Sequence, residues 1–316
     1  MEVSIKQRKS NYFMVSLCLI LLVGTYYYGL RVLFLAVINV FAAITLESIY
    51  YKQVIKLQKS TLVTTLIYTL IIPASLPFHI SVLGLLFGLF FGKIVFGGDN
   101  YYIFSPALVG RVFLHVSFAQ QMSSHWIKPA SNPLGGFVYY LGEKIDTITS
   151  ATPLLQNMWV NKETDLIDLL LGKTAGSIGE TSALIILIIA SILLIRRVIS
   201  ATVFFSSILS ATILCTFYFF FMGETNFTPL HHLLSGGFLF GVVFIATDPT
   251  TMPKASMGKL IYGVLIGVIC MSIRLFATST EGMMFAILIA NMISPFIDYV
   301  SKPTESVKSK LKGGGY

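Results

Sequence analysis

Long apolar runs dominate this sequence, and they restrict the fold more than any other feature. A membrane-spanning helix needs about 20 mostly apolar residues, and about ten stretches approach that length: 12–29, 32–50, 61–77, 79–96, 101–120, 181–195, 199–221, 231–247, 259–276 and 282–299. Only 11% of the residues are charged, whereas a soluble domain carries about 25%. The sequence therefore predicts an all-α polytopic membrane protein of about ten transmembrane helices.

The positive charges predict how these helices are oriented. Lys6, Arg8 and Lys9 precede a first apolar run that continues through Tyr28 without a small-residue cleavage pattern, so we expect it to stay as a helix. With the N-terminus in the cytoplasm, most of the 22 Lys and Arg residues fall on the cytoplasmic side. We expect both termini in the cytoplasm of a bacterium and the long loop 121–180 outside its inner membrane. The net charge of +8 is then a topology and lipid-headgroup signal, and it requires no nucleic-acid partner.

The long loop divides the chain into three parts. Residues 1–120 form a first membrane half of about five helices, 121–180 the extracytoplasmic loop, and 181–316 a second half with a basic cytoplasmic tail. Five is odd, so similar halves would sit inverted in the membrane. The halves share two prolines followed by a glycine ladder: Pro73, Pro77, Gly84, Gly88 and Gly92 in the first, Pro249, Pro253, Gly258, Gly263 and Gly267 in the second. Coincidence and ordinary helix packing are the alternative to an inverted repeat.

Cysteine and histidine do not form a metal-binding pattern. Cys18, Cys215 and Cys270 all lie in apolar runs without a Cys-x-x-Cys pair, and they are expected to be buried small residues. The adjacent His231 and His232 would point to different helix faces. We predict no metal site and no iron–sulfur cluster held by this chain alone. The sequence also lacks the Gly-x-Gly-x-x-Gly pattern of dinucleotide-binding folds.

The segment from Asp146 to Leu154 contains the pattern with the clearest chemistry. Thr152 followed by Pro153 is typical of a helix N-cap followed by proline at the first helical position. A helix start presents free N–H groups and the positive end of the helix dipole, which together favour a phosphate. On the residues alone, an ordinary capped helix start is the alternative interpretation.

A resemblance to a known family adds to this interpretation. Asp146, Thr149, Ser150, Ala151 and Thr152 resemble the flavinylation sequence of the RnfD and NqrB family. The resemblance implies that Thr152 carries FMN through a phosphoester bond made by a dedicated flavin transferase. The charge pattern independently places this segment on the outer side of the membrane.

Three further segments are similar to the same family, and together they cover most of residues 79–300. Residues 105–111 resemble its Asn-Pro-Ala helix, with Ser105 where Asn is expected. Residues 176–183 resemble its Gly-Glu-Thr-Ser turn, and residues 232–249 its Gly-Gly-Phe to Ala-Thr-Asp-Pro helix. The departure at Ser105 affects only the role of that side chain.

The resemblance implies a function. It implies a flavin-carrying membrane subunit of the Rnf complex, which relays electrons between ferredoxin and NAD⁺ and couples this to Na⁺ or H⁺ translocation. The partners would be the other membrane and peripheral subunits, and a second, non-covalent flavin (riboflavin or FMN) is implied. Such a chain would be one subunit of a translocating oxidoreductase, with no catalytic residues of its own.

Three other functions stay open at this point. The short region before the first helix and the Thr-Ser-Ala-Thr-Pro-Leu sequence favour an RnfD-like chain over an NqrB-like subunit of a Na⁺-pumping NADH:quinone oxidoreductase. Inverted halves with Gly- and Pro-broken helices fit a secondary transporter or channel equally well. A purely structural assembly subunit would bind no flavin of any kind.

A few polar residues are candidates for cofactor or ion contacts. The turn at Gly176, Ser177 and Glu180 is either a flexible helix entry or a backbone nest for a flavin ring or phosphate. Arg111 lies inside an apolar segment, where it would contact a cofactor or form a structural pair. Asp248 would belong to an ion pathway or simply end its helix.

Glu47 and Arg274 lie near span ends, and we expect both to extend toward the membrane surface. These assignments use sequence position alone.

Overall fold

A computed structural model shows an all-helical architecture in the part of the chain that it describes. The described residues are 2–52, 58–99, 101–123, 126, 127, 129, 165–180, 182–222, 228–277 and 282–301. Within them, helices and turns account for the regular structure. The predicted fold class, an all-α polytopic membrane protein, is confirmed.

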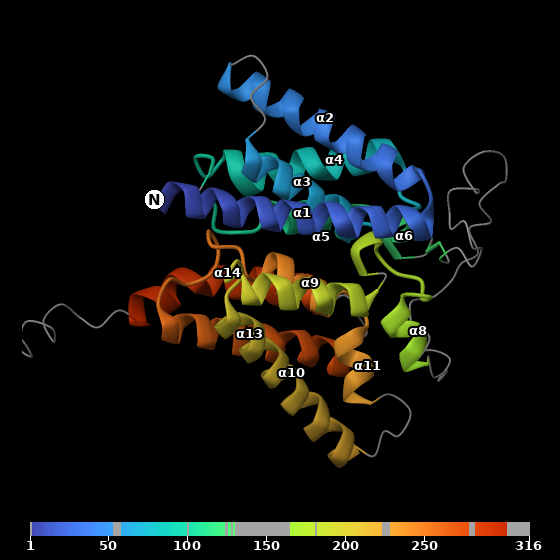
Figure 1. The fold of residues 1–316 in the computed structure, drawn as a ribbon, viewed down its shortest axis with the longest axis vertical. Helices are drawn as coiled ribbons and strands as arrows, with labels where there is room; N and C mark the ends of the chain where they lie inside the picture. The colour runs from blue at the N-terminus through green and yellow to red at the C-terminus, as the bar shows by residue number, and fades with distance from the viewer. Residues whose placement is uncertain are drawn as a thin grey trace, which may run out of the picture.

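The first half of the chain contains several helices in succession. They are α1 (Glu2–Tyr28), α2 (Arg31–Tyr51), α3 (Lys59–Ile71), α4 (Phe78–Leu89), the π-helix η1 (Phe90–Ile94), α5 (Pro106–Ser117) and α6 (Ala119–Ser123). η1 continues α4 without a break, so the two form one membrane element. Figure 1 shows these helices gathered in one group.

Two short elements lie in the region predicted as the long loop: α8 (Leu166–Leu171) and the 3₁₀ turn η3 (Ile178–Glu180). The second half contains α9 (Ala183–Ile195), α10 (Ala201–Met222), α11 (Pro229–Leu234), α12 (Phe238–Phe240), the π-helix η4 (Gly241–Ile245), α13 (Ser256–Phe276) and α14 (Gly282–Ser301). In Figure 1, α9 to α14 form a second group, and α9 lies against α1 of the first.

Each of the ten predicted spans contains helix, but the spans differ in length. Five helices are long and apolar enough to cross a membrane, and three apolar elements at 59–71, 78–94 and 183–195 are shorter. The predicted spans 101–120 and 231–247 are interrupted. In the second of them, Gly236 and Gly237 have φ of 64° and 67°, a left-handed conformation that glycine adopts without steric cost. They separate α11 from α12.

The order of helix contacts recurs in the two halves. α2 packs on α4 and α4 on α5, while in the second half α10 packs on α13 and α13 on α14. The paired prolines lie near the junction of the third and fourth predicted spans of each half: Pro73 and Pro77 before α4, and Pro249 and Pro253 before α13. This recurrence supports a repeat, and the inverted orientation of the halves stays a prediction.

Both glycine ladders lie at close helix contacts. A Cβ on Gly88 of α4 would meet the Pro106 carbonyl oxygen, and it would come within 2.9 Å of the Gly110 Cα on α5. A Cβ on Gly267 of α13 would come within 2.9 Å of the Ala211 backbone nitrogen on α10. Small residues let helix backbones approach this closely in membranes.

We predict that Gly88→Ala lowers stability by about 1–3 kcal/mol, the usual cost of overpacking. The added methyl group would meet backbone atoms of α5, which cannot move aside as a flexible side chain would. Thermal unfolding of the purified chain in detergent measures the change. Leu83→Met is the control, since Leu83 lies on the same helix and is exposed. Equal melting temperatures for Gly88→Ala and wild type would contradict the close contact.

Candidate functional site

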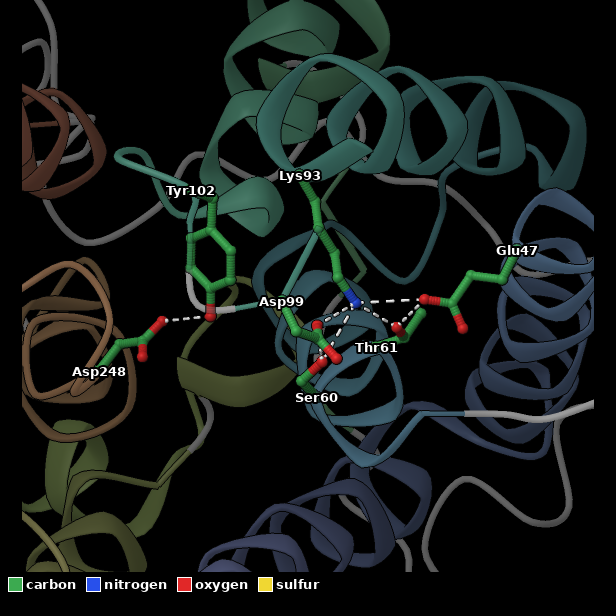
Figure 2. Close-up of polar contacts among 7 residues, drawn as sticks. All are labelled: Glu47, Ser60, Thr61, Lys93, Asp99, Tyr102 and Asp248. Carbon is green, nitrogen blue, oxygen red and sulfur yellow. Dashed lines mark hydrogen bonds and ion pairs between the residues drawn. The ribbon is translucent and has the colours of Figure 1, made fainter. Parts of the chain in front are cut away.

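A buried lysine is the centre of a cluster of five polar side chains. Lys93 lies on η1 and is 1% exposed. Its Nζ lies 2.6 Å from Asp99 Oδ1 and 3.2 Å from Glu47 Oε1. It also donates to Thr61 Oγ1 at 2.5 Å and to Ser60 Oγ at 3.1 Å. Figure 2 shows the ammonium group surrounded by these four side chains. A lysine in an apolar element normally extends to the surface, whereas this one is held inside by oxygen atoms.

Three elements converge to build this cluster. α2 contributes Glu47 from its last turns, and α3 contributes Ser60 and Thr61 from its first turn. After η1, Gly97 and Gly98 have φ of 102° and 95°, so the chain reverses and returns Asp99 to Lys93. A larger residue at Gly98 would also meet the Tyr51 hydroxyl, because a Cβ there would lie 2.5 Å from it.

A second polar contact joins the loop that carries Asp99 to the other half of the molecule. Tyr102 follows Asp99 in the same loop, and its hydroxyl donates to Asp248 Oδ2 at 3.1 Å. Asp248 follows η4, and its Oδ1 accepts the Thr250 N–H at 2.9 Å. Burial raises the pKa of the Asp248 carboxyl, and the Thr250 N–H partly offsets that rise. Figure 2 shows Tyr102 between Asp99 and Asp248. The role of Asp248 in an ion pathway stays a prediction.

Four other predicted site residues lie together at a second place in the fold. Arg111 on α5 places Nη1 3.9 Å from Oε1 of Glu180 on η3. Ser177 donates its hydroxyl to the same oxygen at 2.9 Å, and its N–H to Glu180 Oε2 at 3.4 Å. A Cβ on Gly176 would lie 3.2 Å from Glu180 Oε2. The structure therefore brings Arg111, Gly176, Ser177 and Glu180 into one ionic cluster between the two halves.

This second cluster borders a small cavity. The cavity has a volume of about 20 Å³, and Arg111, Glu180, Gly237 and Phe240 are among the residues that line it. A cavity of this size holds about one water molecule.

The backbone of the turn before α9 is already hydrogen-bonded. The Ile178 N–H donates to the Ile72 carbonyl at 3.3 Å, and the Glu180 N–H to the Ser177 carbonyl at 3.0 Å. The Tyr28 hydroxyl donates to the Gly176 carbonyl at 3.2 Å. These bonds join the turn to the ends of α1 and α3. The N–H groups of Ser177, Ile178 and Glu180 therefore have acceptors within the chain, and the role of the turn as a nest for a flavin or phosphate stays a prediction.

The expectation that Glu47 and Arg274 extend to the surface is wrong. Glu47 is 6% exposed and Arg274 is 4% exposed. Arg274 donates to the His232 carbonyl at 2.6 Å and to the Gly236 carbonyl at 2.5 Å. The break after α11 leaves these carbonyls without helical donors, and Arg274 supplies them.

Sequence reasoning missed the Lys93 cluster because it counted Lys93 only as a charge that sets topology. A usable signal was present. Glu47 and Lys93 are ionisable residues of opposite sign inside two separate apolar runs. Each is costly alone in a membrane, so a contact between the two is the simplest interpretation.

The flavinylation segment falls outside the described residues. Asp146, Thr149, Ser150, Ala151 and Thr152 all belong to that part of the chain. Their proposed chemistry therefore rests on the sequence.

We predict that Lys93→Met destabilises the protein by about 3–5 kcal/mol, the usual loss when one member of a buried ion pair is removed. The substitution keeps an unbranched side chain but leaves Asp99 and the two hydroxyls without the ammonium group. Thermal unfolding in detergent measures the loss. Lys254→Met is the matched control, because Lys254 is exposed. A loss at Lys93 no larger than that of the control would contradict a stabilising role for the cluster.

Comparison with known proteins finds relatives among the B subunits of Na⁺-translocating NADH-quinone reductases. The chain is similar to the B subunit of the Na⁺-translocating NADH-quinone reductase of Klebsiella pneumoniae subsp. pneumoniae. The two are 33% identical over 264 residues, which is 79% of this chain and 61% of that protein. The B subunit of the Yersinia pestis reductase is 33% identical over 270 residues, with the same shares. That of Neisseria meningitidis serogroup B is 31% identical over 261 residues, or 80% and 62% of the two chains.

The similarity extends over nearly the whole chain, although the chain spans only about three fifths, 61%, of the length of the first relatives. Residues 3–306 match the sequence profile described as the NQR2, RnfD, RnfE family. That range contains both buried ionic clusters and the Asp146 to Thr152 segment. The chain therefore belongs to the NQR2, RnfD, RnfE family.

Proposed function

We propose that the chain is the flavin-carrying membrane subunit of an ion-translocating electron-transfer complex. The family match over residues 3–306 carries the proposal. The Asp146 to Thr152 segment adds the chemistry, since it has a hydroxyl at an expected helix start where backbone N–H groups would receive a phosphate. FMN esterified to Thr152 would supply the redox chemistry, and the protein would supply its position and surroundings.

The relatives favour one complex over the other. The Klebsiella, Yersinia and Neisseria proteins are all named as the B subunit of a Na⁺-translocating NADH-quinone reductase, which favours an NqrB-like chain over an RnfD-like one. The Thr-Ser-Ala-Thr-Pro-Leu sequence keeps the Rnf complex as the second candidate. In either complex, the other membrane and peripheral subunits would be the partners, and a flavin transferase would attach the FMN.

Arg111 and Glu180 border a small cavity in the described part of the chain. With Gly176 and Ser177, these two residues hold the turn that leads from the loop into α9. We therefore propose that the four residues position the end of the loop that contains the Asp146 to Thr152 segment.

We predict that Thr152→Ala abolishes covalent flavin. The chain is expressed with a flavin transferase, denatured and run on a gel, and the wild type should give a fluorescent band and an intact mass increased by FMN. The variant should give neither, because it lacks the esterified hydroxyl. Thr164→Ala, which removes a hydroxyl from the same loop outside the motif, should keep both. A wild-type chain without added mass under these conditions would contradict the proposal and favour a transporter or a structural subunit.

The identity of the complex has a separate test. The chain is purified from native membranes with its partners, and the preparation is assayed for NADH-dependent quinone reduction and for electron transfer between ferredoxin and NAD⁺. The proposal expects one of these activities, and it expects Thr152→Ala to remove it. Solute transport by the chain alone, unchanged by Thr152→Ala, would instead indicate a secondary transporter.

A further inference from the structure

Two helices from different halves of the chain meet at one end of the bundle, where both carry positive charge. α9 lies beside α1 in Figure 1, and the Arg196 guanidinium, just past the end of α9, lies over the Tyr12 ring of α1, 5.5 Å from its centroid. Arg8 lies one turn before Tyr12 on the same face of α1, because residues four apart are neighbours on a helix. Lys9 and Arg197 are adjacent in sequence to these arginines, and all four cations are exposed. These four cations and Tyr12 form the α1–α9 basic patch.

The described part of the chain supplies no carboxylate to this patch. The ion pairs between described side chains join Lys93 to Glu47 and Asp99, and Arg111 to Glu180. Four like charges at one surface repel one another, so an anion bound among them would lower the electrostatic energy of the folded chain. A guanidinium that stacks on an aromatic ring keeps its N–H donors in its own plane, where they suit a phosphate. The patch is therefore suited to an anion from outside the chain.

Arg197 has a backbone conformation that is costly for an arginine. Its φ is 52°, in the left-handed region that favours glycine. The Arg197 N–H donates to the Leu194 carbonyl at 2.9 Å, and the Val198 N–H donates to the Leu193 carbonyl at 2.8 Å. Glycine normally ends a helix with this pair of hydrogen bonds. Since glycine would end α9 at lower cost, the arginine indicates a role for the side chain.

Exposed apolar side chains continue from the patch along both helices. At helical spacing, they are Val15, Leu19 and Leu22 on α1, and Leu184, Ile188, Ile192 and Ile195 on α9. The stripe on α1 begins beside Tyr12, and the stripe on α9 ends beside Arg196. Cations at one end of two lipid-exposed stripes match a molecule with an anionic headgroup and acyl chains.

We propose that the α1–α9 basic patch binds one anionic phospholipid. The phosphodiester group accepts N–H donors from Arg196 and Arg197, while Arg8 and Lys9 add positive charge around it. The acyl chains lie along the exposed stripes of α1 and α9. Because α1 belongs to the first half of the chain and α9 to the second, the lipid bridges the two halves. The site depends on the membrane-spanning fold and not on a flavin at Thr152.

The position of the patch favours a lipid over a soluble anion. Arg8 is the first residue of a candidate membrane span, Arg8–Tyr28, and phospholipid headgroups lie at the ends of such spans. A free phosphate would contact the cations alone. A phospholipid contacts the cations and both apolar stripes, so it gains apolar burial as well as charge neutralisation.

Lipid binding to the purified full chain tests the site. Native mass spectrometry in detergent measures the affinity for phosphatidylglycerol and for phosphatidylcholine with the same acyl chains, and the wild type should bind one phosphatidylglycerol more tightly. Arg196→Gln should weaken phosphatidylglycerol about fivefold, the usual effect of one cation near a membrane surface, and leave phosphatidylcholine unchanged. Lys254→Gln, which removes an exposed cation outside the patch, should change neither. Equal wild-type affinities for the two lipids, or equal losses in the two variants, would overturn the proposal.

Arg197→Gly separates a lipid contact from a structural role. Without added lipid, its melting temperature should equal or exceed that of the wild type, because glycine adopts the left-handed conformation without strain. Its affinity for phosphatidylglycerol should nevertheless fall about fivefold. A lower melting temperature without lipid, or an unchanged affinity, contradicts the site.

Two further measurements distinguish other anions. Inorganic phosphate in excess should not displace phosphatidylglycerol, and displacement would show a free-phosphate site instead of a lipid site. If Arg196→Gln lost a protein that co-purifies from native membranes while it kept the wild-type affinity for phosphatidylglycerol, the patch would be a protein interface and the lipid site would be wrong. Thr152→Ala should bind phosphatidylglycerol as the wild type does, so a failure here is distinct from a failure of the flavin assignment.

Discussion

The absence of water inside a bilayer is the constraint on which this structure depends. A backbone carbonyl or a charged side chain in the hydrocarbon region must find its donor or acceptor within the protein. Continuous helices such as α2 and α13 meet this requirement through their own hydrogen bonds. Wherever a helix breaks or an ionisable residue enters, the chain has to supply a specific contact, and those contacts mark the places where function can reside.

Two arginines show how the chain meets this requirement at helix breaks. Arg31, at the start of α2, donates through Nε to the Ala74 carbonyl at 2.9 Å and through Nη2 to the Leu76 carbonyl at 3.1 Å. These carbonyls lie in the turn between α3 and α4. Arg274, near the end of α13, does the same for the break between α11 and α12. Each guanidinium replaces helical N–H donors that the break removes, so both charges are structural even though both are ionisable residues in apolar surroundings.

The sequence predicted the helices well and their internal breaks less well. Each of the ten apolar runs contains helix in the described residues, and five of these helices are long enough to cross a membrane. The π-helices η1 and η4 were not predicted, since an extra residue per turn leaves no compositional trace in runs such as 90–94 and 241–245. The break after Leu234 was visible only as two glycines, and a glycine pair in a membrane helix also serves close packing.

The two candidate sites also differ in how far the sequence predicted them. Glu180 and its neighbours were found because they are consecutive in a recognisable motif, whereas the contact between Glu47 and Lys93 depends on how α2, α3 and η1 pack. Helix packing of this kind follows from many small contacts at once, so a pattern within one segment cannot specify it.

The two ionic clusters lie at opposite ends of α3. Ser60 and Thr61 in its first turn contact Lys93, while Ile72, just past its last residue, accepts a hydrogen bond from Ile178 beside Glu180. Thirteen residues of helix separate these ends by about 20 Å. The Glu47 and Glu180 carboxyl groups therefore lie near opposite ends of this helix. A change of charge at one cluster would therefore have to act on the other through displacement of α3 or through the Tyr102–Asp248 contact between the halves, because direct electrostatic influence over that distance is weak.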